Sequence, residues 1–313
     1  MSIVPEHISV ALLAGGTSGE RSISLESGKG ASTALREAGF SVTELDPANK
    51  EDLVTLVTGD FDVAFLCLHG KGGEDGAMQG MLEVLGLPYT CPGVWSSATA
   101  MDKEKAKVFY RQNDIQTPIS ITVSKNQDYD AAGLLAQVGS RVVVKPAAEG
   151  SALGVSICES AQEVEDALTS TFDIAQTAMV ETFVAGRELT VAVLGNDNPQ
   201  VLPVIEILPQ LGEFYDYESK YAPGGSKHLC PAPLEPEATA LAQSVALAAH
   251  KALKCRGVSR TDMILDENCS MWVLGTNTIP GMTETSLLPD AGRAAGISFP
   301  ELCTKLVEYA LED

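Results

Sequence analysis

The residues with the clearest chemical pattern lie near the C-terminus, on two strands that we expect to form a hairpin, residues 259–266 and 271–278. Arg260 and Asp262 are two positions apart and therefore share one face of the first strand. Asn277 lies on the second strand, and we expect it to face Asp262 across the hairpin. Carboxylate and amide oxygens suit Mg²⁺, and a neighbouring arginine suits a developing oxyanion or a phosphate. The spacing alone is equally compatible with a polar pair at the surface.

Two lysines are candidates for contact with a phosphate. Lys145 ends a predicted strand, residues 141–145, in which the three preceding residues are valines, and a charge without a partner is costly there. We therefore expect Lys145 to face a ligand. Lys103 lies on a predicted helix with other basic residues, and by itself it is more typical of a solvated side chain.

Two carboxylates follow at a strand–turn–strand segment. Glu181 ends an apolar run, and Glu188 lies just beyond Gly186 and Arg187. Acceptors placed in this way can hold the amino group and the ribose hydroxyls of a nucleotide. The other interpretation is that both are edge carboxylates on a hairpin.

Three glycine-rich loops follow predicted strands, at residues 14–19, 69–76 and 146–154. Such loops expose backbone N–H groups that can cradle an anion, although each is also ordinary turn chemistry. None has the spacing G-x-x-x-x-G-K-[ST], and the first is not G-x-G-x-x-G. The sequence therefore predicts neither a P-loop nor a dinucleotide-binding fingerprint.

The elements that would position these residues fall into three regions. Residues 1–95 alternate buried strands, glycine turns and helices, which predicts a Rossmann-like parallel-sheet domain. Residues 96–184 have the pattern of a second, α+β region. Residues 185–313 have the pattern of long strands at 189–194 and 201–207, a polar loop at 212–229, a helix at 236–254, the hairpin described above and terminal helices. The predicted class is α/β (α+β), with three domains.

Composition limits the possible partners. The 313 residues are 45% hydrophobic and 20% charged, which is typical of a well-packed protein and not of a disordered chain. A net charge of −21 argues against nucleic acid and against anionic membranes as partners. The seven cysteines are scattered without a Cys-x-x-Cys pair, so we interpret them as reduced thiols. With no signal peptide and no apolar run long enough to cross a bilayer, we expect a cytoplasmic protein.

Taken together and in this order, the motifs of the chain resemble those of the D-alanine–D-alanine ligase family of the ATP-grasp superfamily. Single motifs are common, but the ordered set is highly specific and covers almost the whole chain. The set comprises Gly15-Gly16-Thr17-Ser18-Gly19-Glu20-Arg21, His69-Gly70, Gly73-Glu74-Asp75-Gly76, Met101-Asp102-Lys103, Lys145-Pro146, Glu149-Gly150-Ser151, Glu181, Gly186-Arg187-Glu188, residues 214–221, Cys230-Pro231-Ala232, Arg260-Thr261-Asp262 and residues 277–283.

The resemblance implies a three-domain ATP-grasp fold with ATP held between the central and C-terminal domains, and Mg²⁺ or Mn²⁺ as the metal. It implies that ATP phosphorylates the carboxylate of one D-alanine, after which the amine of a second attacks the acyl phosphate. The product would be D-alanyl-D-alanine for peptidoglycan precursors. It further implies a homodimer. Tyr221, which relatives that accept D-lactate or D-serine usually replace, favours D-alanine as the second substrate.

The resemblance also implies roles for individual residues. Glu20 should hold the ammonium of the first D-alanine and connect through Ser151 to Tyr221, with His69 beside this substrate. Arg260 and the Gly281 amide should stabilise the tetrahedral intermediate, and Ser286 and Leu287 should frame the second D-alanine. The expected ATP-binding residues are Lys103, Lys145 and Lys220 at the phosphates, Glu181, Phe183, Val184 and Glu188 at the adenosine, and Phe214; the expected metal ligands are Asp262 and Asn277.

One position departs from the family pattern in a way that matters. The family has a metal-bridging glutamate two residues before Asn277, where this chain has Gly275. Because side chains alternate along a strand, a glutamate at 275 would point to the same side as Asn277. Loss of groups that merely support metal ligands costs about 10–100-fold, so loss of a ligand should cost at least that. The alternative to an active ligase is therefore a ligase-like protein that binds ATP and ligand with negligible turnover.

Overall fold

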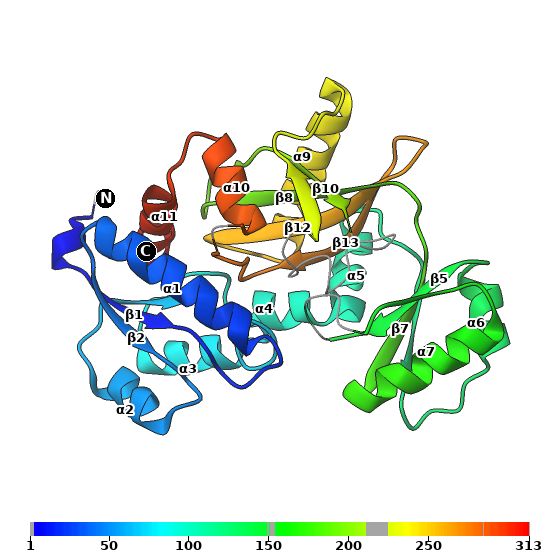
Figure 1. The fold of residues 1–313 in the computed structure, drawn as a ribbon, viewed down its shortest axis with the longest axis horizontal. Helices are drawn as coiled ribbons and strands as arrows, with labels where there is room; N and C mark the ends of the chain where they lie inside the picture. The colour runs from blue at the N-terminus through cyan, green and yellow to red at the C-terminus, as the bar shows by residue number, and fades with distance from the viewer. Residues whose placement is uncertain (1–2, 149, 151–153, 211–224, 284, 313) are drawn as a thin grey trace.

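A computed structural model describes residues 3–148, 150, 154–210, 225–283 and 285–312. Three sheets organise these described residues, and each falls within one of the three predicted regions (Figure 1). The first and second sheets lie towards opposite ends of the molecule, and the third lies between and above them. The domain boundaries themselves stay a prediction.

The first sheet is parallel, with strand order β2-β1-β3. Strands β1 and β3 are buried and β2 is largely exposed, and the strands alternate with helices, which confirms the expected α/β opening of the chain. In α1, Gly28 permits close packing, because a Cβ at this position would lie only 2.4 Å from the Ala14 Cβ. The elements are η1 (Pro5–His7), β1 (Ser9–Leu13), α1 (Arg21–Glu37), β2 (Ser41–Leu45), α2 (Lys50–Thr58), β3 (Val63–Leu66) and α3 (Ala77–Leu85).

The second sheet is antiparallel, with order β4-β7-β5-β6, and its apolar residues form a core with α6 and α7. A reciprocal cap between Ser160 and Glu163 fixes the start of α7. The elements are β4 (Ser120–Ser124), α6 (Ala131–Val138), β5 (Val142–Pro146), β6 (Ser156–Cys158), α7 (Ala161–Ile174) and β7 (Thr177–Thr182).

The third sheet has the main path β11-β10-β8-β12-β13, with β9 paired to β8. Helix α9 packs on one face. Part of the other face packs against α10 and α11 in a core that it shares with the first sheet. The elements are β8 (Arg187–Leu194), β9 (Gln200–Val201), β10 (Ile205–Pro209), β11 (Ser226–Leu229), α9 (Pro236–Ala252), β12 (Val258–Leu265), β13 (Met271–Asn277), α10 (Leu287–Ala294) and α11 (Phe299–Leu311).

Two helices, α4 (Val94–Met101) and α5 (Lys103–Gln112), connect the first sheet to the second. The apolar residues of α5 pack with α9 and β13 of the third sheet. Tyr110 of α5 is fully buried and donates a hydrogen bond of 2.8 Å to the Thr276 hydroxyl on β13. Helix α5 therefore places its side chains between the second and third sheets.

Two sequence predictions in the third region were wrong in detail. The expected strand at 201–207 is split into β9 and β10, because Pro203 has no N–H with which to continue the ladder. The expected loop at 212–229 ends earlier, since its last four residues form β11 and pair with β10.

None of the helices in the described residues is long and apolar enough to cross a membrane.

Candidate active site

Three buried charges meet between α5 and the second sheet. Lys145 on β5 forms an ion pair with Glu181 on the neighbouring strand β7. The Lys107 Nζ, from α5, lies 2.7 Å from the Glu181 Oε2 and donates a hydrogen bond of 2.7 Å to the Pro118 carbonyl. Exposed fractions are 1% for Lys107, 2% for Glu181 and 8% for Lys145. The carboxylate is thus held between two ammonium groups.

Burial and ion pairing shift the pKa values of Glu181 and Lys107. Desolvation by itself raises the pKa of Glu181, but Lys145 and Lys107 outweigh it and hold that pKa below the usual range. Burial lowers the pKa of Lys107 to about 8, although Glu181 opposes the shift. Because β7 is an interior strand of its sheet, the interpretation of Glu181 as an edge carboxylate is wrong.

A second polar group lies on one face of the third sheet. The Arg260 Nε and Nη2 donate to the two carboxylate oxygens of Asp262, each at 2.9 Å. The Thr190 hydroxyl, from β8, donates to the Asp262 Oδ1 at 2.6 Å. Glu188 shares this face, since it and Thr190 are two positions apart on β8. The face therefore carries an arginine–carboxylate pair that a neighbouring strand holds in place.

The register of the hairpin differs from the sequence prediction. Asp262 lies directly opposite Gly275, and Arg260 lies opposite Asn277, so Asp262 and Asn277 are diagonal neighbours. A bulge between the Asp262 and Met263 pairs shifts the pairing by one residue on β13. All four positions still share one face, as the two-residue period requires.

Gly275 leaves open space on this face. A Cβ built there meets no heavy atom within 4 Å, and its backbone is outside the left-handed region that favours glycine. The backbone and its surroundings would accept a side chain at this position. Asn277 keeps its amide close to the chain, with its Oδ1 accepting a hydrogen bond of 2.9 Å from the Ile279 N–H.

A third group surrounds Glu20, the residue that precedes α1. A Cβ at Gly70 would lie 2.6 Å from the Glu20 Oε2, and one at Gly150 would lie 2.5 Å from it, so both loops approach this carboxylate closely. The Glu74 Oε2 accepts a hydrogen bond of 2.7 Å from the Gly70 N–H. Burial, and then the charge of Glu20, raise the pKa of Glu74 to about 8.

His69 links this group to the third sheet. Its Nε2 lies 3.2 Å from the Ser27 hydroxyl, whose oxygen also accepts a hydrogen bond of 3.2 Å from the Met282 N–H. Burial lowers the pKa of His69 to about 4, and the charge of Arg260 lowers it further. His69 is therefore neutral at pH 7, and it is close enough to Arg260 for the guanidinium charge to affect its pKa.

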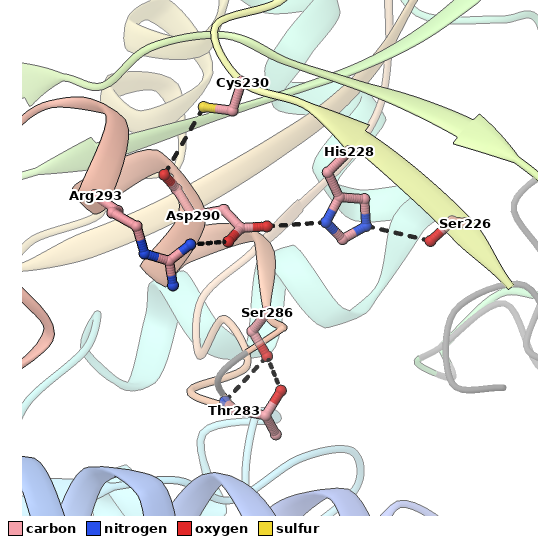
Figure 2. A network of polar contacts seen from close by, with 7 residues as sticks. All are labelled: Ser226, His228, Cys230, Thr283, Ser286, Asp290 and Arg293. Carbon is pink, nitrogen blue, oxygen red and sulfur yellow. Dashed lines mark hydrogen bonds and ion pairs between the residues drawn. The ribbon is translucent and has the colours of Figure 1, made fainter. Parts of the chain in front are cut away.

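Ser286 lies where the chain enters α10, and Figure 2 shows its contacts. Its hydroxyl accepts a hydrogen bond of 3.0 Å from the Thr283 N–H and lies 2.7 Å from the Thr283 hydroxyl. A Cβ at Gly281 would lie 2.8 Å from the Ser286 oxygen, so the two predicted residues are close. Leu287 is buried in the core that α10 shares with the first sheet.

The same view shows a charged network that the sequence reasoning missed. The His228 Nδ1 lies 3.0 Å from the Asp290 Oδ2 and its Nε2 3.2 Å from the Ser226 hydroxyl, while Arg293 donates to the Asp290 Oδ1 at 2.8 Å (Figure 2). Burial raises the pKa of Asp290, but the bonds from His228 and Arg293 outweigh it and lower that pKa. This network joins β11 to the first turn of α10.

The predicted adenosine residues lie at the end of β7 and the start of β8. Phe183 stacks under the Arg141 guanidinium, 4.1 Å from its ring centroid, and its N–H donates to the Arg141 carbonyl at 3.0 Å. Val184 follows it. The Lys103 N–H donates to the Ala147 carbonyl at 3.0 Å, which brings the start of α5 to the glycine loop after β5.

Comparison with known proteins gives a consistent result. Residues 111–308 match the family described as D-ala D-ala ligase C-terminus, and residues 43–92 match D-ala D-ala ligase N-terminus. The chain is 44% identical over 309 residues to a D-alanine–D-alanine ligase from Syntrophobacter fumaroxidans, covering 98% of this chain and 99% of the relative. The relative from Desulfotalea psychrophila is 43% identical over 98% of this chain and 96% of its own length. The chain belongs to the D-alanine–D-alanine ligase family.

Solved ligase structures agree with this assignment. The D-alanine–D-alanine ligase from Bacillus anthracis, complexed with ATP, superposes with a TM-score of 0.85 at 31% identity, covering 97% of each chain. The VanG D-Ala:D-Ser ligase from Enterococcus faecalis gives 0.85 at 29% identity, covering 97% of this chain and 99% of the other. The chain therefore has the mixed α/β ATP-grasp fold that its motifs implied.

Not every predicted ligase residue can be placed. Ser151, Phe214, Lys220 and Tyr221 lie outside the described residues. Lys107 and Glu74, by contrast, are buried at the site and were not assigned from sequence. Glu74 was visible in the glycine-rich loop at 69–76, whereas Lys107 looked like one more residue of a basic helix.

Proposed function

We propose that this chain joins two D-alanines to D-alanyl-D-alanine for peptidoglycan precursors, with cleavage of ATP to ADP and phosphate. The observation that carries the proposal is the 44% identity, over nearly the full length of both chains, to a protein named D-alanine–D-alanine ligase. The same likeness favours an active ligase over a ligase-like protein without turnover.

The nucleotide is proposed to lie between the second and third sheets. Lys103, Lys145 and Lys220 contact its phosphates, and Phe214 contributes to the same ATP site. Glu181, Phe183, Val184 and Glu188 hold the adenosine. Two facts support this assignment: the ligase structure at TM-score 0.85 is an ATP complex, and charged groups of this chain converge there from three elements.

The residues present are suited to Mg²⁺ only in part. Asp262 and Asn277 offer hard oxygen donors on one sheet face, but within the described part of the chain no three His, Cys, Asp or Glu side chains form a metal-binding group. Because Mg²⁺ usually takes one or two carboxylates together with substrate phosphates and water, this donor set is adequate once nucleotide is bound. When bound, the ion offsets the charge of the transferring phosphate.

The chain itself orients and stabilises the reacting groups. Glu20 accepts from the ammonium of the first D-alanine, whose carboxylate takes the γ-phosphate of ATP, and neutral His69 lies beside it. The amine of the second D-alanine then attacks the acyl phosphate. Arg260 and the Gly281 N–H donate to the oxyanion of the tetrahedral intermediate, while Ser286 and Leu287 frame the second substrate. Ser151 and Tyr221 complete the link from Glu20.

The setting of the enzyme is part of the proposal. We infer a cytoplasmic homodimer with the three domains 1–95, 96–184 and 185–313, and with neither nucleic acid nor membrane as partner. The family resemblance supports the dimer and the domain division. The net charge of −21 supports the absence of nucleic acid and anionic membranes as partners.

Product analysis tests the activity directly. The protein is incubated with ATP, Mg²⁺ and either L-alanine or D-alanine, the latter alone or together with D-lactate or D-serine. ADP release is followed by a coupled assay, and the product is identified by mass spectrometry. We expect ADP release with D-alanine but not with L-alanine, and D-alanyl-D-alanine as the product. A depsipeptide with D-lactate, or a mixed dipeptide with D-serine, in the absence of D-alanyl-D-alanine would contradict the proposal.

A further inference from the structure

Two lysines share the buried Glu181, but their surroundings differ. The Lys107 side chain is 1% exposed, and its Nζ contacts both the Glu181 Oε2 and the Pro118 carbonyl, each at 2.7 Å. The Lys145 side chain is 10% exposed and pairs with the other carboxylate oxygen, Oε1. Lys107 is thus held on two sides, whereas Lys145 lies at the more open side of the pair.

The proposed function requires Lys145 to contact a phosphate. If Lys145 were the only partner of Glu181, its movement to the nucleotide would leave a fully buried carboxylate without a counterion. Breaking a buried ion pair by removing one partner is strongly destabilising, because the remaining charge is uncompensated. Nucleotide binding would then have to overcome this penalty.

We propose that Lys107 is the permanent counterion of Glu181. Because Lys107 stays in place, Lys145 can leave Glu181 for the nucleotide phosphates without leaving the buried carboxylate unpaired. The proposal rests on the proposed function in one respect, the assignment of Lys145 to a phosphate. Lys107 itself touches no nucleotide and is a positioning residue, which acts through Glu181.

The charges around Lys107 agree with this role. Burial lowers its pKa to about 8, Glu181 on β7 raises it, and Lys145 on β5 and Arg111 on α5 lower it. If Lys145 moves away, one of the lowering charges is lost, and Lys107 should bind protons more strongly. Near pH 8 nucleotide binding should therefore be accompanied by uptake of up to about half a proton, in proportion to the change in protonation.

A double-mutant cycle separates this role from a structural one. ATP binding is measured by calorimetry with Mg²⁺ and without D-alanine, for wild type, Lys107→Met, Glu181→Gln and the double variant. If Lys107 acts through Glu181, the effects of the two substitutions on ATP binding are not additive. We therefore expect Lys107→Met to weaken ATP binding by about tenfold or more in the wild-type background, but by less than about threefold in the Glu181→Gln background. Lys105→Met, an exposed lysine of the same helix paired with Glu104, is the matched control and should leave binding unchanged.

Equal losses in both backgrounds, or no loss in either, would overturn the proposal. Should Lys107→Met fail to fold, Lys107→Gln, which removes the charge but keeps a polar end, takes its place in the same cycle with the same expected results. Failure of this proposal and failure of the proposed function give different results. If the effects of Lys107→Met and Glu181→Gln on ATP binding are non-additive but no dipeptide is formed, only the ligase activity is contradicted. If turnover is normal but the two effects are additive, only the role of Lys107 is contradicted.

Discussion

The two ends of the proposed nucleotide site are built differently. At the second sheet, Glu181 is buried between Lys145 and Lys107 and forms an ion pair with each before any ligand binds. At the third sheet, Asp262 provides the carboxylate on a face where its cross-strand neighbour is Gly275, with open space above it. Nucleotide binding and metal-dependent turnover should therefore respond to separate changes.

The difference has a physical reason. A buried carboxylate needs counterions at all times, whereas a metal site can leave part of its charge compensation to ligand phosphates and water. A chain that loses one metal-binding carboxylate can thus keep its fold and its nucleotide affinity while its turnover falls. The predictions below test this separation, beginning with the largest expected effect.

Asp262→Asn should reduce turnover by at least about 1,000-fold, roughly 4 kcal/mol of transition-state stabilisation, because it removes the carboxylate of the metal end. The nucleotide dissociation constant should change little. Steady-state kinetics with saturating ATP and D-alanine measure the rate, and calorimetry measures binding. The matched control is Asp266→Asn at the hairpin tip, where the carboxylate accepts from Trp272 and lies outside the proposed site; equal losses in the two variants would contradict the role of Asp262.

Lys145→Ala should produce the opposite pattern. A hydrogen bond to a charged group contributes about 1.5–3 kcal/mol, so ATP should bind roughly 10–100-fold more weakly. Folding should persist, because Lys107 still neutralises Glu181. Calorimetry and thermal unfolding measure the two quantities, with Lys105→Ala as the control. An unchanged ATP affinity would mean that Lys145 does not face the phosphates.

Gly275→Glu should raise turnover by about tenfold, or roughly 1.4 kcal/mol. The strand backbone and the open space at this position admit the side chain, which would project beside Asn277 and opposite Asp262. Gly275→Ala separates the carboxylate from the loss of a glycine and should leave turnover within about twofold. If both variants gain equally, chain stiffening and not metal binding is the cause.

Asp290→Asn should have the smallest effect, a loss of about 1 kcal/mol in the free energy of unfolding at pH 7. His228 and Arg293 hold the pKa of Asp290 below its unfolded value, so this stability is present above the unfolded pKa and is lost as pH falls through the folded one. Wild type and variant should therefore converge at low pH. Urea unfolding from pH 7 to pH 3 measures it, with Glu267→Gln, which makes the same charge change at an exposed site, as control; a gap that stays constant with pH would contradict the assignment.

Local patterns predicted much of the fold and part of the site. The valine run before Lys145 indicated a charge that needs a partner, and the structure provides Glu181; that Lys145 faces a ligand stays a prediction. The two-residue period correctly put Asp262 and Asn277 on one face. The direct partner of Asp262 was wrong: the hairpin register places Gly275 opposite Asp262 and Asn277 opposite Arg260, and no local signal in the sequence fixes that register. That Ser286 frames the second substrate and that the Gly281 N–H stabilises the tetrahedral intermediate stay predictions.

Local sequence patterns could not predict ion pairs between residues that are far apart in the chain. Glu181 lies 36 residues from Lys145, and His228 lies 62 residues from Asp290. Helical periodicity cannot tell which of several lysines on α5 will be covered by other elements, so the buried Lys107 looked no different from the exposed Lys105. Tertiary packing decides which charges become partners.

The magnesium dependence of the rate, measured side by side for wild type and Gly275→Glu at saturating ATP and D-alanine, tests the separation of the two ends most directly. If the metal end is the incomplete one, the glutamate should shift the half-maximal rate to a lower magnesium concentration while the ATP dissociation constant stays the same. Superimposable magnesium curves would contradict this account, because they would mean that the space at Gly275 is already compensated.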